Sequence, residues 1–300
     1  MLKKNKAFWV AMLVMVLWGL LFPTVKLGYK VFGIQSIGDT LAFAGVRFVV
    51  CGILITAFTA WKMPQGFKAL KTGWWRVLLS GLFAIILHYA CTYTGLRSTD
   101  GSKTAILKQL GAVFYICFAA LFFPEDKLTW GKVAGLVLGI GGIFAINAGG
   151  GSFRLQLGDW LILGASFCTV FSNIVSKKAF KTVEPMVLTG VSQIFGGVVL
   201  LIAGLACGGN VTTVVPKTLP QVGVFAMIAT ASVISYCLWF MTVQKENLSK
   251  LFIIKFSEPL FAAVFGWMIL GEDIFKLSYL ASFLLICAGI LIANRKPKAQ

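Results

Sequence analysis

The chain has 300 residues, of which 58% are hydrophobic and only 12% are charged, about half the charged share of ordinary soluble domains. Because so little polar surface cannot coat a soluble globule, the composition excludes a soluble enzyme, a secreted domain and a disordered chain. We therefore expect an all-α integral membrane protein, with room for about ten bilayer spans of about 20 residues each.

The net charge of +17 is large enough for a nucleic-acid partner, but its distribution argues against one. Basic residues stand in short clusters between apolar runs, as at Lys3, Lys4 and Lys6, which is typical of segments that flank a membrane. The expected partners are therefore the lipid bilayer and a solute, and not nucleic acid. The seven cysteines are scattered without a C-x-x-C pair, which indicates free thiols, and no cofactor or metal is expected.

Apolar stretches long enough to cross a bilayer follow one another along the whole chain. The first is too long for the core of a cleavable signal peptide, so it is interpreted as the first membrane helix. Turn-forming residues separate the stretches, as at Gly149-Gly150-Gly151-Ser152. We expect ten transmembrane helices, at residues 8–27, 40–61, 74–97, 104–123, 130–147, 158–178, 186–207, 222–244, 250–270 and 276–293.

Lysine and arginine are distributed unequally between the two sets of loops. With the N-terminus in the cytoplasm, most of them fall on the cytoplasmic side, including Lys62, Lys68, Lys71 and Arg76. Because cytoplasmic loops of membrane proteins are enriched in these residues, we expect a multi-pass protein of the cell (plasma) membrane with both termini in the cytoplasm.

The two halves of the sequence resemble each other. At an offset of 147 residues identical residues coincide in several segments: Tyr89 with Tyr236, Ser102 with Ser249, Lys108 with Lys255, and Glu125-Asp126 with Glu272-Asp273. An offset of 145 residues places Gly45 on Gly190 and Gly52 on Gly197. Similarity at one offset indicates an internal duplication, and we call the coinciding residues and helices repeat mates.

Each half holds five of the expected helices. Because five is odd, the second half enters the membrane from the opposite side, which gives the inverted-topology repeat of secondary transporters. We expect a first five-helix repeat at residues 1–148, a glycine-rich linker at 149–157, and a second repeat at 158–300 that ends in a short basic cytoplasmic tail. Similar halves of opposite orientation can expose one site to either side in turn, so the architecture predicts alternating access.

Several short motifs accompany the repeat. They are Trp18-Gly19 and Phe22-Pro23 in the first span, Gly45 and Arg47-Phe48 in the second, Glu125-Asp126-Lys127-Leu128 after the fourth, and Glu258-Pro259 and Gly271-Glu272-Asp273 at the ninth. In this combination the chain resembles the drug/metabolite transporter superfamily, specifically its EamA-type ten-helix members. The resemblance implies a bundle around a central cavity that exports or exchanges small organic solutes. The chain departs from the family at Gly111-Ala112, where a proline matching Pro259 is often found.

Ionisable side chains inside the expected spans are candidate site residues, because each costs roughly 3 kcal/mol at the bilayer centre. They are Arg47, His88, Lys108, Lys255 and Glu258. Lys108 and Lys255 are repeat mates, and in a cavity they would suit a substrate with a carboxylate or phosphate. The alternative is that both side chains reach outward to the membrane interface.

Glu258 follows Lys255 by three residues and so shares its helix face. Two interpretations stay open. Glu258 is either a protonatable group that couples transport to a proton gradient, or the partner of Lys255 in a buried ion pair. Proline at position 259 leaves the carbonyl of Lys255 without its helical amide partner, so a kink is expected there. In the second interpretation the ion pair stabilises the kinked helix.

Polar and aromatic residues complete the candidate substrate-binding set. Arg47 either faces the cavity or reaches outward, and His88 is either a satisfied core residue or a proton relay. His88 begins a stripe with Tyr89, whose mate helix carries Tyr236 and Trp239. The candidate set is Trp18, Arg47, His88, Tyr89, Lys108, Tyr236, Trp239, Lys255 and Glu258, with Ser172, Asn173, Ser192 and Gln193 as further lining residues.

The leading hypothesis is a secondary active transporter, an exporter or exchanger, of a small organic metabolite. The alternative is a membrane-embedded enzyme acting on lipid head groups. No catalytic residues can be assigned, because no nucleophile–base set or metal cluster can be assembled from the sequence. Glu125-Asp126 and Glu272-Asp273 are expected to cap the helices that follow them. Gly131, Gly135 and Gly139 predict close helix packing or a homodimer seam. The sequence leaves the substrate, the direction and the coupling open.

Overall fold

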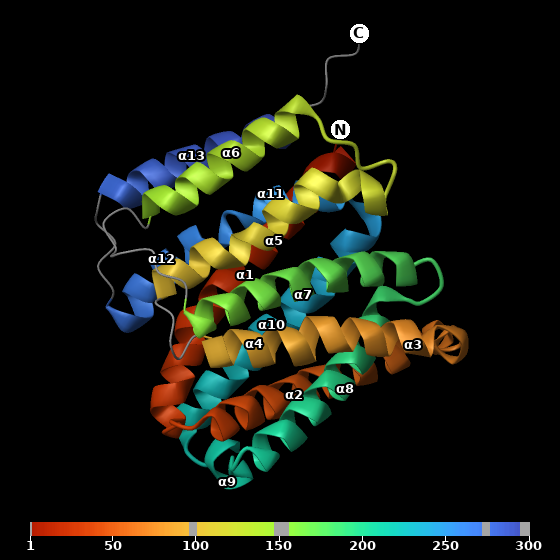
Figure 1. Ribbon diagram of the computed structural model, residues 1–300. Helices are drawn as coiled ribbons and strands as arrows, with labels where there is room; N and C mark the ends of the chain where they lie inside the picture. Colours follow the sequence, from red (N-terminus) through yellow and green to blue (C-terminus); the bar gives the residue numbers. More distant parts are fainter. Residues whose placement is uncertain (1, 96–100, 147–155, 272–276, 295–300) are drawn as a thin grey trace.

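The computed structural model describes residues 2–95, 101–146, 156–271 and 277–294, and within these ranges the chain forms helices and no strand (Figure 1). The first half contains α1 (Leu2–Phe32), α2 (Ile37–Lys62), the short 3-10 helix η1 (Pro64–Phe67), α3 (Leu70–Gly81), the π-helical turn η2 (Leu82–Leu87), α4 (His88–Gly95), α5 (Gly101–Phe122) and α6 (Trp130–Ile146). The second half contains α7 (Leu157–Ala179), α8 (Pro185–Ala206), α9 (Val211–Val214), α10 (Leu219–Lys245), α11 (Leu248–Lys255), α12 (Glu258–Leu270) and α13 (Leu277–Asn294). Most of the predicted linker, and Glu272-Asp273, lie outside the described residues.

The predicted all-α membrane fold is confirmed at the level of its helices. In the described part of the chain, seven segments are long and apolar enough to cross a membrane: Lys6–Phe32, Ile37–Lys62, Leu70–Gly95, Leu157–Ala179, Pro185–Ala206, Leu219–Lys245 and Leu248–Leu270. Two shorter apolar helical stretches are Leu107–Ala119 and Phe283–Ala293. The total of ten spans therefore stays a prediction.

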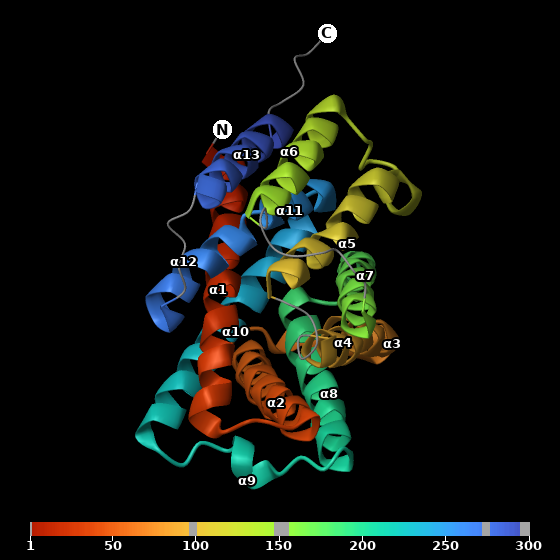
Figure 2. The ribbon, with the colours of Figure 1, turned by 60° about the vertical axis from the view of Figure 1, so that its left-hand side comes forward.

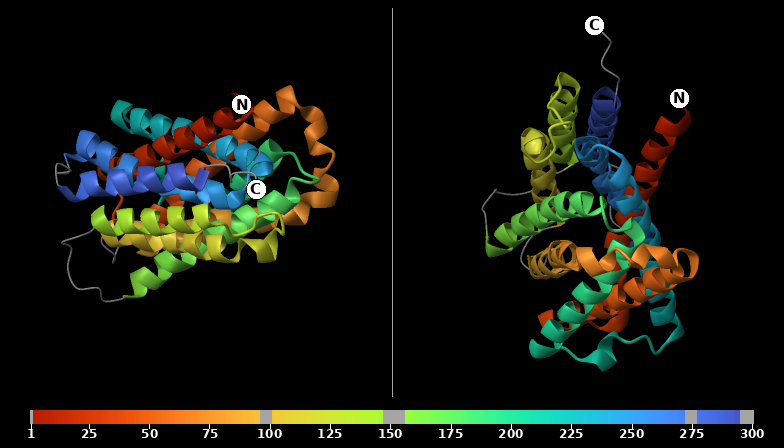
Figure 3. Two further views of the ribbon diagram at one scale, coloured as in Figure 1. Left: turned by 90° about the horizontal axis from the view of Figure 1, so that it is seen from above. Right: turned by 90° about the vertical axis from the view of Figure 1, so that its right-hand side faces the viewer.

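The long helices lie roughly along one axis of the bundle and cross it in alternating directions, so their connections gather at its two ends (Figures 1 and 3). The α2–α3, α5–α6, α7–α8 and α10–α11 connections share the right-hand end of Figure 1 with the start of α1 and the end of α13. Helices α6 and α13 pack together at one edge of the bundle, and α2 and α8 pack together at the opposite edge (Figure 2). The remaining long helices lie between these two pairs.

Helices α2 and α8 approach so closely that their backbones touch. A β-carbon added at Gly52 would lie 2.6 Å from the backbone nitrogen of Ile194, and one added at Gly197 would lie 2.6 Å from that of Val49. In lipid no hydrophobic driving force brings helices together, so their association depends largely on close van der Waals packing. Small residues permit this packing because they let the backbones approach. The two glycines therefore fix how α2 sits on α8.

The glycine stripe of α6 is used inside the chain. A β-carbon at Gly135 would lie 2.6 Å from the β-carbon of Ala293 in α13, and one at Gly139 would lie 2.5 Å from the ring of Phe256. The prediction of close helix packing is thus confirmed for α6 and α13. The same stripe is covered by α13 and Phe256, so it is not a free face for a second subunit.

The two prolines inside expected spans act differently. Helix α1 continues through Pro23, whereas the ninth segment is broken into α11 and α12 just before Pro259. The break is bridged by amides that bond three residues back, Phe256 to Ile253 at 3.2 Å and Ser257 to Ile254 at 3.0 Å. The expected kink is therefore a short interruption, and it lies within the protein, where such backbone is tolerated at membrane depth.

Asp126 does not cap the helix that follows it, contrary to our expectation from the sequence. Its carboxylate accepts from the Lys132 ammonium at 2.5 Å, from the Tyr115 hydroxyl at 3.1 Å and from the Ser249 amide at 3.2 Å. Ser249 lies in the first turn of α11, so Asp126 caps a helix of the other half of the chain. Burial alone would raise the pKa of the Asp126 carboxyl, but the hydrogen bonds from Lys132 and Ser249 outweigh it and lower this pKa below its ordinary value.

We predict that Gly52→Ala and Gly197→Ala each destabilise the bundle by about 1–3 kcal/mol, because the new methyl group must push the α2 and α8 backbones apart. The matched control is Gly223→Ala in α10, where nothing lies within 4 Å of an added β-carbon and alanine favours the helix by up to about 1 kcal/mol. Thermal unfolding in detergent measures both effects. Equal melting temperatures for Gly52→Ala and Gly223→Ala would contradict the close contact.

We predict that Asp126→Asn lowers stability by roughly 3 kcal/mol at neutral pH, because it leaves the Lys132 ammonium buried without its counter-charge. A depressed carboxyl pKa stabilises the fold above the unfolded value of about 4 and loses this effect as the pH falls through the folded value. The gap between wild type and variant in melting temperature should therefore persist from pH 7 to 5 and shrink below about pH 4. Glu125→Gln, which changes an exposed neighbour, should leave the profile as in wild type. A pH-independent gap would show that charge is not the cause.

Candidate functional site

The nine residues of the predicted substrate-binding set come together in the interior of the bundle, and we call them the central cluster. Helix α1 supplies Trp18, α2 supplies Arg47, α4 supplies His88 and Tyr89, α5 supplies Lys108, α10 supplies Tyr236 and Trp239, and the α11–α12 break supplies Lys255 and Glu258. Six separate elements therefore converge, and the contacts described next connect the residues.

Lys255 and Glu258 form an ion pair, with the Lys255 ammonium 2.7 Å from the Glu258 carboxylate. Both side chains are nearly buried, with 11% and 7% of their surface exposed. The interruption before Pro259 separates them, so one ends α11 and the other begins α12. The same ammonium lies 4.9 Å from the ring centre of Trp18, a cation–π contact that ties α1 to this pair.

The contacts of Lys108 favour a side chain that lies within the bundle over one that reaches out to the membrane interface. Its ammonium lies over the ring of Phe22 in α1, 4.6 Å from the ring centre. Its charged neighbours are Glu258 and Lys255, and His88 lies within electrostatic range. Two cations and one carboxylate therefore share this part of the cluster.

Arg47 also points inward and is almost completely buried, with 2% of its surface exposed. Its guanidinium donates to the Ser232 hydroxyl from Nε at 3.1 Å and from a terminal nitrogen at 2.8 Å, and to the Tyr93 hydroxyl at 3.3 Å. The guanidinium carbon lies 4.8 Å from the ring centre of Phe48 and 5.8 Å from that of Tyr89. These partners hold and orient the cation, but all of them are neutral.

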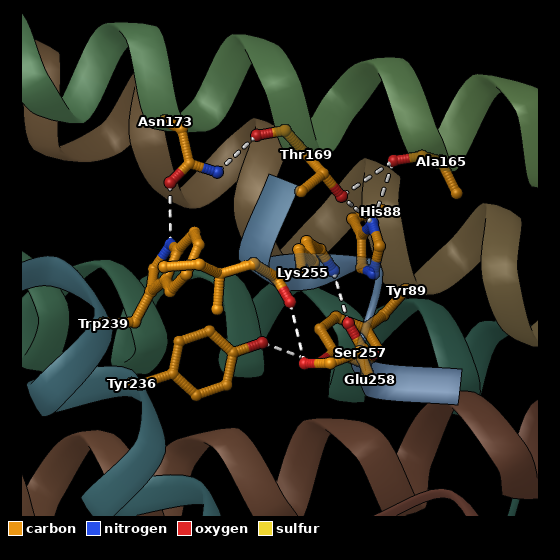
Figure 4. A network of polar contacts seen from close by, with 11 residues as sticks. His88, Tyr89, Ala165, Thr169, Asn173, Tyr236, Trp239, Lys255, Ser257 and Glu258 are labelled. Atoms are coloured by element: carbon orange, nitrogen blue, oxygen red, sulfur yellow. Dashed lines mark hydrogen bonds and ion pairs between the residues drawn. The ribbon is translucent and has the colours of Figure 1, made fainter. Parts of the chain in front are cut away.

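The repeat mates Tyr89 and Tyr236 meet at the middle of the cluster. Their hydroxyl oxygens are 2.6 Å apart (Figure 4). The ring of Tyr236 contacts that of Trp18 at 6.0 Å between centres, and Trp18 contacts Trp239 at 4.9 Å. Aromatic side chains thus fill the space between the Arg47 guanidinium and the Lys255–Glu258 pair.

A chain of hydrogen bonds runs along α7 beside the cluster (Figure 4). Nδ1 of His88 lies 2.9 Å from both the Ala165 carbonyl and the Thr169 hydroxyl. The Asn173 amide donates to the Thr169 carbonyl at 2.7 Å and accepts from the Trp239 indole at 2.7 Å. His88 therefore has the partners expected of a satisfied core residue, and Asn173 joins the cluster as a lining residue.

Among the described residues, no hydrogen bond joins the side chains of the other suggested lining residues to the cluster. The hydroxyls of Ser172 and Ser192 bond to carbonyls of their own helices, and the Gln193 amide is buried without a hydrogen-bond partner in the described part of the chain. The sequence interpretation also missed Phe22, Thr169 and Ser232. Each lies one helical turn from a chosen residue, since Phe22 follows Trp18 by four, Thr169 precedes Asn173 by four and Ser232 precedes Tyr236 by four. Because residues four apart lie on the same face of a helix, this spacing from the predicted residues could have identified all three.

Comparison with known proteins places the whole chain in one group. The sequence model of the EamA-like transporter family matches residues 5–148 and 156–295. A relative from Bacillus subtilis, named the uncharacterized transporter YvbV, is 28% identical over 99% of this chain and 94% of its own length. The uncharacterized inner membrane transporter YedA of Escherichia coli K12 is 24% identical over 94% of this chain and 88% of its own length.

Two further comparisons bear on function and fold. A protein of Streptantibioticus cattleyicolor, named a probable terminal-alkyne amino-acid exporter, is 22% identical over 98% of this chain and 95% of its own length. A solved crystal structure, 17% identical in sequence, superposes with a TM-score of 0.77 over 97% of this chain and 96% of that one, which shows a shared fold. The matching family and these named relatives are transporters and not enzymes, so the alternative of a membrane-embedded enzyme is set aside.

Proposed function

Because the chain belongs to the EamA-like transporter family, and is therefore a membrane transporter, we propose that it is a secondary active transporter of a small organic metabolite. In this proposal two five-helix halves rock about the central cluster and open it to either side of the cell membrane in turn. The observation that carries the proposal is the cluster itself, in which buried charges from both halves of the chain meet. Intramembrane charges of this kind mark substrate pathways.

The inverted repeat is supported by contacts that are reciprocal between repeat mates. An added β-carbon at Gly52 would approach Ile194, and one at Gly197 would approach Val49; the 145-residue offset converts one contact into the other. Residues late in α2 contact residues early in α8, so the two mates are antiparallel. A two-fold axis that relates antiparallel helices lies across them, in the plane of the membrane, as an inverted repeat requires.

The packing partners of the other helices follow the same relation. Helix α1 packs against α10 and α12, and its mate α7 packs against α4 and α5, which are the mates of α10 and α12. Helices α6 and α13 are mates and pack on each other. Tyr89 and Tyr236, which are also mates, share a hydrogen bond, as residues beside a two-fold axis can. We therefore keep the proposed repeats at residues 1–148 and 158–300, joined by the linker at 149–157.

We predict that cysteines placed at residues 103 and 250 of a cysteine-free protein are labelled from opposite faces of the bilayer, because these repeat mates belong to inverted halves. With both termini in the cytoplasm, residue 250 should be protected from an impermeant reagent in intact cells and residue 103 should react. Lys62→Cys, on the expected cytoplasmic side, is the control for protection. Labelling of 103 and 250 from the same face would overturn the inverted repeat.

The substrate is proposed to be anionic, because Lys108 and Lys255 supply two cations from the two repeats and only Glu258 opposes them. The ion pair of 2.7 Å supports a structural role of Glu258 in holding the α11–α12 break. A role in proton coupling is the second candidate, since a proton or an anionic substrate would each release Lys255 from Glu258. A homodimer is left open as a further proposal.

We predict that Lys108→Ala and Lys255→Ala each reduce transport of an anionic metabolite at least about tenfold, because each removes a buried counter-charge, while membrane insertion stays intact. The measurement is counterflow in liposomes, with a solute chosen because it raises the melting temperature of the purified protein. Lys181→Ala, which changes an exposed loop lysine, should transport as wild type does. Unchanged counterflow in both lysine variants would remove the case for an anion.

Glu258→Gln should abolish the pH dependence of transport but retain exchange if the carboxylate carries the proton.

A further inference from the structure

The central cluster holds more positive than negative charge. Its cations are Arg47, Lys108 and Lys255, and its one carboxylate is Glu258, which is already paired with Lys255. Within the described residues this leaves a formal excess of two positive charges in the interior of a membrane protein. Such an excess is costly in a low-dielectric interior unless a counter-charge arrives.

The other described carboxylates are held at the ends of the bundle, where they serve other partners. Asp39 accepts from Ser36 and from the Asn210 amide, Asp126 from Lys132 and Ser249, and Asp159 from the Gln156 amide at the start of α7, while Glu125, Glu184 and Glu246 stand at or beside helix termini. Within the described ranges, therefore, no further carboxylate meets Arg47 or Lys108.

Arg47 is a buried cation whose hydrogen-bond partners are all neutral. It is 2% exposed, and its three hydrogen bonds go to two neutral hydroxyls, those of Ser232 and Tyr93. A guanidinium carries five N–H donors, so two remain for a ligand. Arg47 is thus oriented by α4 and α10, and among the described residues no carboxylate pairs with its charge.

Contacts through the tyrosine pair connect Arg47 with the part of the cluster that holds Lys108. The Arg47 guanidinium carbon lies 5.8 Å from the ring centre of Tyr89. Tyr89 bonds Tyr236, the ring of Tyr236 contacts that of Trp18, and Trp18 contacts the Lys255 ammonium. Lys108 has Glu258 and Lys255 as its charged neighbours and lies over the ring of Phe22 in α1. A ligand that replaces the contact between Tyr89 and Tyr236 would therefore lie on the path between Arg47 and the Lys255–Glu258 pair, whose further charged neighbour is Lys108.

We propose, on the premise of the transport function above, that the substrate is an organic diacid. One acidic group pairs with Arg47 and the second with Lys108, beside the Lys255–Glu258 pair, while the short carbon skeleton lies between the aromatic rings. Arginine favours planar two-oxygen groups such as carboxylate or phosphate, and lysine accepts any anionic oxygen as a point charge. The shared chemistry is two anionic oxygen groups on one small molecule.

The test compares each diacid with a partner that has the same shape but one neutral end. The probes are the α,ω-dicarboxylates from malonate to adipate, each beside its monoamide, and 2-phosphoglycolate as the phosphate arm. The readout is the concentration that gives half-maximal thermal stabilisation of the purified wild-type protein. At least one diacid should bind about tenfold or more tightly than its neutral-ended partner.

Variants assign the two ends of the ligand. Arg47→Gln and Lys108→Gln should each bring the diacid down to the affinity of the monoamide, whereas Lys62→Gln, a charge loss at the end of α2, should keep the wild-type ratio. Arg47→Lys keeps the charge and checks the fold, and it should retain part of the preference. Lys108→Gln tests the proposal independently if the Arg47 variants do not fold.

The outcomes separate this inference from the transport function. A wild-type protein that binds no diacid better than its monoamide, or variants that keep the preference, would overturn the diacid. Counterflow of a neutral or singly charged metabolite would contradict the proposal of a diacid substrate but would support the proposed transport function. Failure of any organic solute to show counterflow would overturn the transport function itself.

Discussion

The contact between α2 and α8 sets the position of the buried charges. Gly45 and Gly52 lie on the face of α2 that touches α8, with an added β-carbon at Gly45 only 2.5 Å from the backbone nitrogen of Leu201. Arg47 follows Gly45 by two residues and so points roughly 200° around the helix, away from α8. The glycine contact on one face therefore directs the guanidinium on the other face toward Ser232 of α10 and Tyr93 of α4. A larger residue in the contact would displace both at once.

Much of this arrangement could be predicted from the sequence, because it depends on local pattern. Apolar length located the helices, and the repeat offset paired Tyr89 with Tyr236 before their hydroxyls were seen 2.6 Å apart. The cost of charge in lipid identified Arg47, Lys108, Lys255 and Glu258 as candidate site residues. These are properties of single segments, or of two segments that the duplication makes comparable.

Other features depend on where distant side chains meet, and no local pattern encodes them. The sequence predicts that Asp126 caps the next helix, but its carboxylate accepts a hydrogen bond from the backbone amide of Ser249, 123 residues away. Ser232 and Thr169 look like ordinary hydroxyls of a membrane helix, and only the approach of Arg47 and His88 makes them part of the cluster. The choice between an inward and an outward lysine was equally open, because the length of the side chain permits both. Packing of α5 against α7, and the position of α1, favour the inward side chain for Lys108.

The contacts that join the two halves at the cluster are individually weak. Arg47 to Ser232, Tyr89 to Tyr236 and Trp18 to Lys255 are hydrogen bonds with neutral groups or a cation–π contact, each worth roughly 1–3 kcal/mol. The strong interaction of the cluster, the Lys255–Glu258 ion pair, lies within the second half. Rocking of the halves would therefore break several small contacts and preserve the ion pair. Contacts of this size can be exchanged between two conformations, and a ligand that binds one conformation more tightly than the other would shift the equilibrium between them.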